Sequence, residues 1–440
     1  MLCQFAFRNF KSFKNEAFLD FYAEPITDNN ESLIIDSDGE KFLPVASIYG
    51  PNGGGKSTVL EALGFLRQTI VKPVIASKMN EDISIEEKQI LSTAIEETSR
   101  EKYHKFDKAC EQIPIEFEIQ FRTKDKEYRY EISILKSEIT KENLYYRPLD
   151  NEDVIIVFER TGEECVVGED VKFISVEKVK ASLPLLSHLA SSYDIRIIDD
   201  ALSWFLSILF LDYDNPISDK RIMIPKKPKE KTLFFSMFKE MDINISDLRI
   251  EEDGEGEIKD IFCKHIIDGE EFELKIQEES SGTRKIFSCL ARINNCLQTG
   301  QVLIADELDA KLHPKLLRFI IELFTNPFKN EHGAQLLITS HDMINMNPEV
   351  FRRDEIWFCA LNASNASNLY SLIAFKEENG KPPRKDAIYG KRYLEGKYGA
   401  DPYIRKGLNY EPKTQKSKRN KKRASKIERK NEKKEKNCTG

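Results

Sequence analysis

One segment constrains the fold of this chain more than any other: Gly50-Pro51-Asn52-Gly53-Gly54-Gly55-Lys56-Ser57. It fits the phosphate-loop pattern G-x-x-x-x-G-K-[ST] completely. The apolar run Val45–Tyr49 predicts a buried strand before the loop, and apolar residues at helical spacing predict a helix that begins at Lys56. A strand, a glycine-rich loop and a helix in this order indicate an α/β fold.

The residue types of the loop explain what it can bind. Glycines let successive backbone N–H groups point inward around phosphate oxygens, and the following helix presents its positive end to the same anion. Lys56 is expected to reach the β- and γ-phosphates of ATP, and the Ser57 hydroxyl is expected to ligate Mg²⁺. The predicted nucleotide-binding residues of this segment are Gly50, Asn52, Gly53, Gly54, Gly55, Lys56, Ser57 and Thr58.

A second candidate element is an apolar run that ends in two acids, Val302–Ala305 followed by Asp306 and Glu307. A buried strand would deliver both carboxylates to the carboxyl end of a sheet, where open α/β sheets bind ligands. Asp306 is expected to hold Mg²⁺ through water, and Glu307 to act as the general base that polarises the attacking water. Many strands end in acidic residues, so the functional interpretation of this segment depends on the presence of the phosphate loop.

Two further segments follow the same logic. Ser281 and Gly282 open a predicted helix over 280–298, where a helix N-terminus offers an anion site; an ordinary serine cap is the plainer interpretation. His341 follows the apolar run Leu336–Ile338 and would lie at the carboxyl edge of the sheet near the γ-phosphate. The order of the four elements along the chain favours a joint role in ATP chemistry.

Strands and helices alternate along the chain, which predicts a mostly parallel core sheet flanked by helices, with an antiparallel β subdomain and helical insertions. The stretch 248–277 should hold two strands, and 213–232 should be a loop. The predicted parts are an N-terminal ATPase lobe (1–70), a helical insertion (71–112), a β-rich part (113–176), a second helical insertion (177–250), a C-terminal ATPase lobe (251–360), a C-terminal region (361–412) and a basic, disordered tail (413–440).

Composition excludes several classes of protein. No apolar run approaches the ~20 residues of a membrane span, and the N-terminus does not read as a signal peptide, so we expect a cytoplasmic protein. The eight cysteines form no Cys-x-x-Cys pair, which argues against a zinc site. Residues 413–440 hold thirteen Lys or Arg and three Glu, a net charge of +10, while the whole chain carries −7. The body is therefore acidic, and the tail is a candidate contact for nucleic acid or an acidic protein.

These motifs resemble the ABC-type ATPase head shared by SMC, Rad50 and RecF proteins and by overcoming-lysogenization-defect nucleases. The segments Asp306–Pro314 and Tyr389–Ala400 are most similar to abortive-infection ATPases of the AbiL type within the AAA family. The resemblance implies that Ser281 and Gly282 form a signature loop that completes the ATP site of a second subunit in a homodimer or larger homo-oligomer. It also implies that His341 is a switch histidine and that Asn9 and Ser12 lie near the nucleotide base.

The sequence departs from the family pattern in places. His313 stands where transporters have the D-loop aspartate, and Gln68 and Gln120 are both weak candidates for the Q-loop glutamine. No acidic cluster after residue 360 resembles a Toprim nuclease, so an effector nuclease would be a separate protein.

Three functions remain open at this point. The first is an ATP-driven sensor or switch in bacterial anti-phage defence that controls a separately encoded effector. The second is a DNA-repair or chromosome-associated ATPase of the RecF or Rad50 kind that clamps DNA. The third is a module that uses ATP only to hold a dimer together, against which Glu307 argues because such a module would not require a general base.

Overall fold

The structure is a computed structural model that describes residues 1–79, 102–173, 179–211, 225, 228–241, 243–252, 254, 258–310, 312–377 and 380–400. Its centre is a six-stranded core sheet with the strand order β11-β15-β16-β5-β17-β18. Neighbours from β11 to β17 pair in parallel, and β18 pairs antiparallel with β17. The bounds are β5 Val45–Tyr49, β11 Leu209–Leu211, β15 Val302–Ala305, β16 Gln335–Thr339, β17 Ile356–Leu361 and β18 Ser367–Ser371.

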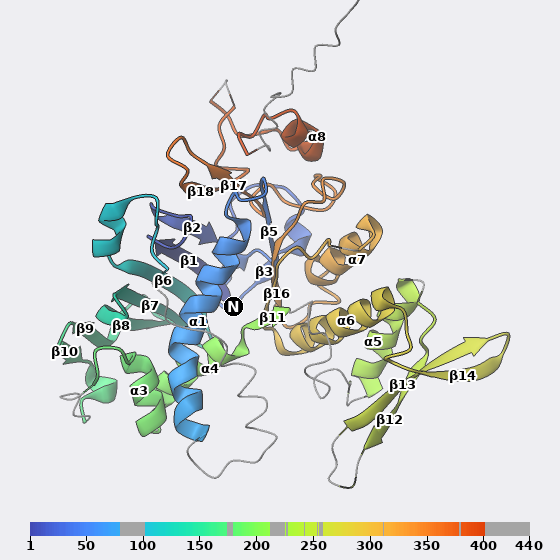
Figure 1. Ribbon diagram of the computed structural model, residues 1–440, viewed down its shortest axis with the longest axis horizontal. Helices are drawn as coiled ribbons and strands as arrows, with labels where there is room; N and C mark the ends of the chain where they lie inside the picture. The colour runs from blue at the N-terminus through green and yellow to red at the C-terminus, as the bar shows by residue number, and fades with distance from the viewer. Residues whose placement is uncertain are drawn as a thin grey trace, which may run out of the picture. The chain divides into compact units, whose positions relative to one another are not determined.

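Apolar layers cover both faces of the core sheet because its side chains alternate between them. On β5, Ala46 and Ile48 join the layer that contains α1, α3 and α4, whereas Val45 and Tyr49 join the layer that contains α5, α6 and α7. The helices span α1 Lys56–Met79, α3 Leu185–Ser192, α4 Arg196–Ser207, α5 Pro228–Glu240, α6 Ser281–Thr299, α7 Pro314–Thr325 and α8 Tyr389–Leu394 (Figure 1).

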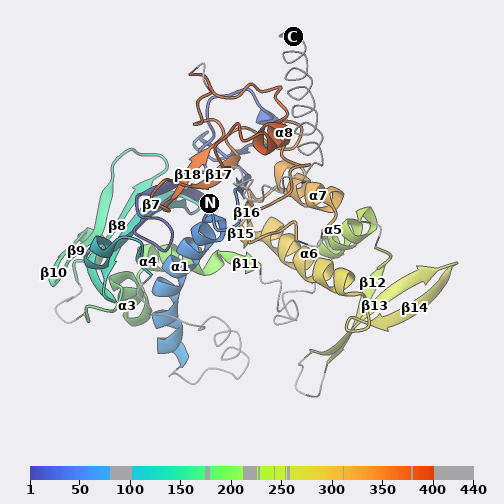
Figure 2. The ribbon, with the colours of Figure 1, turned by 45° about the horizontal axis from the view of Figure 1, so that its top comes forward.

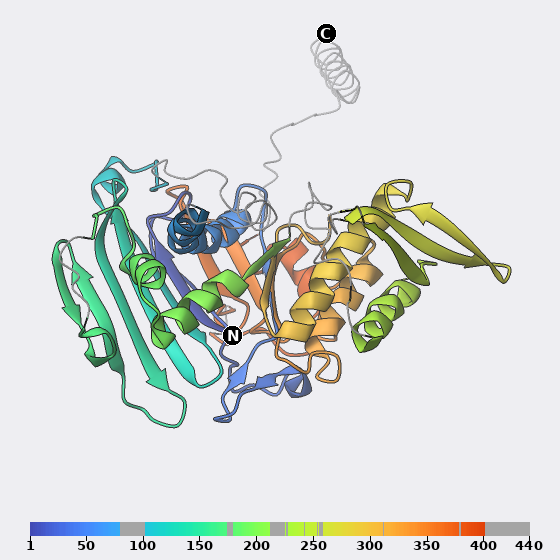
Figure 3. The same cartoon turned by 90° about the horizontal axis from the view of Figure 1, so that it is seen from below.

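A seven-stranded antiparallel sheet stands beside the core sheet, with α1 between them (Figure 3). The two N-terminal strands of this sheet pair antiparallel, with Phe5 opposite Leu19. The strands expected in the β-rich part 113–176 are present. The sheet contains β1 Leu2–Arg8, β2 Ala17–Asp20, β6 Ile115–Arg122, β7 Lys126–Leu135, β8 Glu138–Pro148, β9 Ile155–Thr161 and β10 Glu164–Val167, and a small two-stranded sheet pairs β3 Ile34–Ile35 with β4 Lys41–Phe42.

A three-stranded sheet precedes α6 in the chain and lies beyond α5 and α6 in Figure 2. It consists of β12 Asp247–Glu252, β13 Ile258–Ile267 and β14 Glu270–Lys275. The prediction of two strands here was wrong, because the turn at Asp268 and Gly269 starts a third. Both residues have positive φ, 53° and 86°, as a tight hairpin of the Asp-Gly type requires.

Other elements differ from the predictions more modestly. The predicted helical insertion 177–250 begins with two helices, α3 and α4, which are followed by the short edge strand β11. The helix α5 begins at Pro228, inside the predicted loop over 213–232. Strand β18 and helix α8 were not predicted. Residues 80–101 of the predicted helical insertion 71–112 and the whole tail 413–440 lie outside the described residues.

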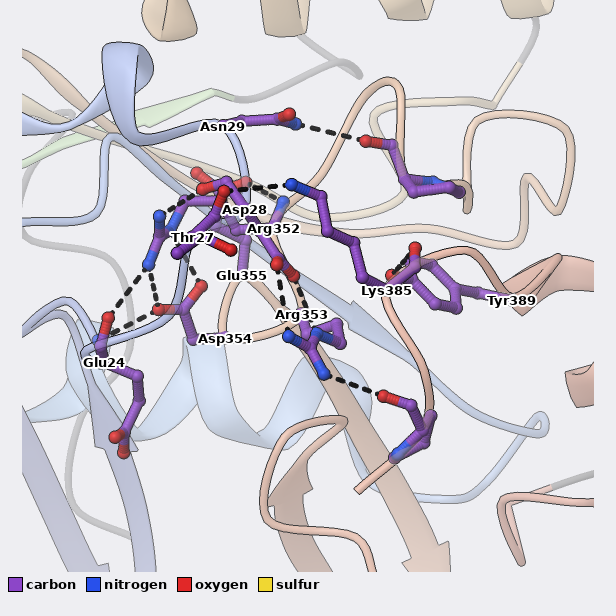
Figure 4. Close-up of polar contacts among 12 residues, drawn as sticks. Glu24, Thr27, Asp28, Asn29, Arg352, Arg353, Asp354, Glu355, Lys385 and Tyr389 are labelled. Atoms are coloured by element: carbon purple, nitrogen blue, oxygen red, sulfur yellow. Dashed lines mark hydrogen bonds and ion pairs between the residues drawn. The ribbon is translucent and has the colours of Figure 1, made fainter. Parts of the chain in front are cut away.

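Two adjacent arginines join three distant segments at the start of β17 (Figure 4). The fully buried Arg352 guanidinium donates to both carboxylate oxygens of Asp354, at 3.0 and 2.8 Å, and to the Glu24 carbonyl. Arg353 forms a two-pronged pair with Asp28 and donates to the carbonyl of Pro383. These bonds fix the N-terminal loop and the chain before α8 to the core sheet. No helix in the described ranges is long and apolar enough to cross a membrane.

Candidate functional site

The phosphate loop connects β5 to α1 at the carboxyl edge of the core sheet, and its glycines are required by the backbone. Gly50, Gly53 and Gly55 have φ values of 154°, 77° and 105°. A Cβ on Gly50 would lie 2.2 Å from the carbonyl oxygen of Cys359, and one on Gly55 would lie 2.5 Å from the Ser367 hydroxyl. The loop therefore packs against β17 and the start of β18 more closely than any side chain allows. Asn52 and Gly53 are exposed at its tip.

Lys56 points back into this loop. Its ammonium donates to the carbonyl oxygens of Gly50 and Pro51, at 3.0 and 3.4 Å, and the residue is 6% exposed. Burial lowers the pKa of Lys56, while the Cys359 thiol and the carboxylates of Glu307 and Asp306 oppose the shift. The cation and the acids predicted to act with it are thus within electrostatic range of each other.

The acids after β15 are held by Thr339 at the end of β16. The Thr339 hydroxyl donates to the Asp306 carboxylate and accepts from the backbone N–H of Glu307 at 2.7 Å. Glu307 has a φ of 46°, a conformation that non-glycine residues rarely adopt and that costs of order 1 kcal/mol. Both acidic side chains are exposed at the sheet edge, where a ligand can reach them.

His341 lies next to Glu307, as its Nε2 is 3.8 Å from Glu307 Oε1. Its backbone N–H donates to the Asp309 carboxylate at 3.0 Å. The predicted base and the predicted switch histidine thus come from adjacent turns, after β15 and β16. Asp309 and Thr339 were missed in the sequence, because each acts through a contact between turns that lie about thirty residues apart.

The loop after β1 approaches the phosphate loop from the other side. The Ser12 hydroxyl is 3.4 Å from that of Thr58, and the Ser12 carbonyl accepts from the N–H of Ser367. Asn9, in contrast, is buried, and its amide donates to the carbonyls of Cys110 and Ile113. This geometry gives Asn9 a structural role and does not support the predicted contact with a nucleotide base.

Ser281 and Gly282 begin α6 on an exposed surface. The preceding Ser280 caps the helix, since its hydroxyl accepts from the Thr283 N–H at 3.0 Å. A Cβ on Gly282 would meet only the Ser280 hydroxyl, at 3.8 Å. None of the hydrogen bonds found in the described part of the chain joins this segment to the phosphate loop. The N-terminus of α6 instead lies toward the three-stranded sheet (Figure 1).

The donors at the carboxyl edge fit a nucleotide with Mg²⁺. The loop has no room for a Cβ at Gly50 or Gly55, Lys56 supplies a cation, and the Ser57 hydroxyl and Asp306 carboxylate are hard oxygen ligands. Such a set suits Mg²⁺, which proteins usually hold by one or two carboxylates together with substrate phosphates. No cluster of three or more His, Cys, Asp or Glu able to hold a metal alone occurs among the residues that the structure describes.

Distant structural similarity exists to SMC head domains. The SMC head domain from Thermotoga maritima has a TM-score of 0.40 and 15% identity, over 84% of this chain and 98% of that chain. The Smc head domain with an extended coiled coil bound to the C-terminal domain of ScpA, derived from Pyrococcus furiosus, has a TM-score of 0.38 and 10% identity, over 84% and 96%. Similarity this low supports no conclusion about activity.

No curated protein sequence matches the chain. One family model does, over residues 45–346, which is more than half of the sequence. The matched span begins at β5 and ends just after His341, so it includes the phosphate loop, Ser281 and Gly282, and the acids after β15. The chain belongs to the family described as "AAA domain, putative AbiEii toxin, Type IV TA system".

Proposed function

We propose that this protein binds ATP with Mg²⁺ at the carboxyl edge of the core sheet and hydrolyses it to ADP and phosphate. The observation that carries the proposal is the convergence of three strand ends. Lys56 follows β5, Asp306 and Glu307 follow β15, and His341 follows β16, and these strands are adjacent in the sheet. Elements about 250 residues apart in sequence thus meet at one edge.

The residues divide the chemistry among them. The loop N–H groups and Lys56 bind the phosphates, since the Lys56 ammonium has three donors and gives only two of them to the carbonyls of Gly50 and Pro51. Ser57 and Asp306 would hold Mg²⁺, which when bound supplies positive charge to the β- and γ-phosphates. Glu307 would accept a proton from the attacking water, and His341, whose Nε2 is 3.8 Å from Glu307 Oε1, would contact the γ-phosphate.

A complete site requires two subunits in this proposal. Ser281 and Gly282 are exposed, and no hydrogen bond among the described residues joins them to their own phosphate loop, so they can meet the nucleotide of a second copy. ATP would then hold a homodimer together, and hydrolysis would release it. Formation and release of this dimer would be the means by which ATP controls a partner protein.

We further propose that this switch acts in bacterial anti-phage defence and controls a separately encoded effector, such as a nuclease. The family description, which names a putative AbiEii toxin and a type IV TA system, supports a place in a two-component system. So does the AbiL-like sequence of Asp306–Pro314 and Tyr389–Ala400. A DNA-clamping ATPase of the RecF or Rad50 kind is the alternative, and ATPase stimulation by DNA in the absence of any partner would favour it.

Two variants test the catalytic proposal. Lys56→Ala should lose most of its affinity for a fluorescent ATP analogue, whereas Lys124→Ala, on an exposed turn, should not. Glu307→Gln should bind ATP, hydrolyse it about 10²- to 10⁴-fold more slowly, and accumulate as a dimer in light scattering. Unchanged affinity in the first variant, or an unchanged rate in the second, would contradict the assignment.

A further inference from the structure

The three-stranded sheet β12-β13-β14 has one charged face and one apolar face, because side chains alternate between the two faces along each strand. On the charged face, the Lys264 ammonium pairs with the Glu271 carboxylate at 2.8 Å. On the apolar face, Cys263 lies opposite Leu274. The Cys263 side chain is fully buried in the layer that contains α5 and α6. The apolar face is therefore the one that packs on the rest of the fold.

This apolar face continues to the end of the β13–β14 hairpin, which projects beyond α5 and α6 (Figure 2). There, Ile267, Phe272 and Leu274 are 52%, 47% and 42% exposed. Phe272 lies opposite His265, which alternates along β13 with the same spacing as Cys263 and Ile267. The three exposed side chains thus share the face of the buried cysteine. We call Ile267, Phe272 and Leu274 the hairpin strip.

A hydrogen bond places the hairpin strip next to the N-terminus of α6. His265 Nε2 is 2.7 Å from Glu279 Oε1, and both side chains are largely buried. Phe272 is the cross-strand neighbour of His265, and the Cβ atoms of such neighbours are about 5 Å apart. Glu279 in turn lies two residues before Ser281. The strip and the start of α6 are therefore side by side on the molecule.

We infer that a second copy of this chain covers the hairpin strip when ATP joins two copies. The inference rests on the dimer of the proposed function and adds an apolar contact to it. A second copy that brings its bound nucleotide to Ser281 and Gly282 comes within a few side chains of Phe272. The side chains of the strip carry no charge, so they suit a protein surface and not the phosphates of a nucleic acid.

Substitutions on the two faces of the hairpin test the inference in the full chain, with Glu307→Gln as the background because ATP should persist in it. In ATP and Mg²⁺, Phe272→Ser should raise the dissociation constant of the dimer at least about tenfold, since each dimer would bury two strips. Ile266→Ser is the matched control, because Ile266 is 53% exposed on the opposite face of the same hairpin. It should dimerise like the background in sedimentation experiments. Both variants should keep the melting temperature and the ATP affinity of the monomer.

Thiol labelling shows directly whether the strip is covered. In the same background, Phe272→Cys should react more slowly with a maleimide in ATP as the protein concentration is raised through the range of dimer formation. Val166→Cys, at a 60% exposed position on the edge strand β10, should react at a constant rate. Mass spectrometry of the labelled peptides distinguishes each new thiol from the native cysteines.

The outcomes separate this inference from the proposed function. If Phe272→Ser dimerises as tightly as Ile266→Ser, or if Phe272→Cys stays equally reactive in the dimer, the strip is not part of the interface and the inference is wrong, while the ATP dimer stands. Protection of Phe272→Cys without dimer formation would also overturn it. If Glu307→Gln binds ATP and forms no dimer at any concentration, the shared site and this inference both fail.

Discussion

The carboxylate of Asp309 accepts a hydrogen bond from the backbone N–H of His341 at 3.0 Å. This bond ties the turn after β15, which carries Glu307, to the turn after β16, which carries the histidine. The other carboxylate oxygen of Asp309 is buried and has no hydrogen-bond partner among the described residues. In the proposed site, Asp309 would therefore be a positioning residue that acts through His341 and not by direct contact with the phosphates.

Loss of the hydrogen bond between Asp309 and the His341 N–H should lower the turnover number more than the affinity for nucleotide. In Asp309→Ala the His341 turn is released, and misplacement of a catalytic group by about 1 Å can cost 10²-fold. We expect kcat to fall roughly ten- to hundredfold with KM for ATP nearly unchanged, measured in a steady-state ATPase assay. Asp309→Asn keeps an acceptor for the His341 N–H and should retain most activity. Equal losses in both variants would point to the charge of Asp309 instead of its hydrogen bond.

The sequence predicted the parts of this fold that depend on local pattern. The strand over Val45–Tyr49, the helix from Lys56, and the strands that carry the acids and the histidine were confirmed because their apolar runs are strong and bounded by clear turns. Contacts between distant turns could not be predicted in the same way. Thr339 and Ser367 are ordinary strand residues in sequence, and only the pairing of β16 with β15 and of β18 with β17 brings them to the site.

In the described part of the chain, Gly282 is exposed and is not hydrogen-bonded to the phosphate loop of its own subunit. A substitution there therefore tests whether the ATP site is shared between two subunits. Gly282→Ala adds a Cβ that meets only the Ser280 hydroxyl at 3.8 Å, so the stability of the monomer and its affinity for ATP should be unchanged. Hydrolysis should nevertheless fall at least about tenfold, because the new methyl group would stand between the helix N-terminus and the partner's phosphates.

Mixed dimers show whether the site is shared. Lys56→Ala and Gly282→Ala chains are each expected to have low activity alone, but a heterodimer would hold one site with both elements intact. Mixing them should therefore restore part of the ATPase rate. If mixed dimers form, as seen with differently tagged chains, and no activity returns, each subunit would have to contain a complete site.

Glu355 should make the stability of the protein depend on pH. Complete burial raises the pKa of this carboxyl well above its ordinary value, although the N–H of Arg352 donates to it. The folded chain then keeps a proton that the unfolded chain releases. The contribution of Glu355 to the free energy of unfolding is thus fully present below about pH 4.5, the ordinary pKa of a glutamate. It is lost as pH rises through the pKa of the folded state.

Glu355→Gln mimics the protonated carboxyl and should therefore be more stable than the wild type at pH 8, with a smaller difference near pH 4.5. Its amide oxygen can still accept from the Arg352 N–H. Melting temperatures across this range measure the effect, and Glu152→Gln, at an exposed position, serves as the control. A gain that does not vary with pH would show that the carboxyl is not protonated in the folded protein.

The tail 413–440 should recruit a negatively charged partner, nucleic acid or an acidic protein surface, because it carries +10 on a chain whose total is −7. All predicted catalytic residues precede residue 342, so a 1–412 protein should keep its basal ATPase rate. It should bind DNA and RNA more weakly, with a shallower dependence on salt, since fewer counterions are released from the phosphates. Binding of the full chain should itself weaken as salt rises, because the Debye length is only about 8 Å at physiological ionic strength. Equal affinity and equal salt dependence for the two proteins would leave the tail as a solvated segment without a nucleic-acid partner.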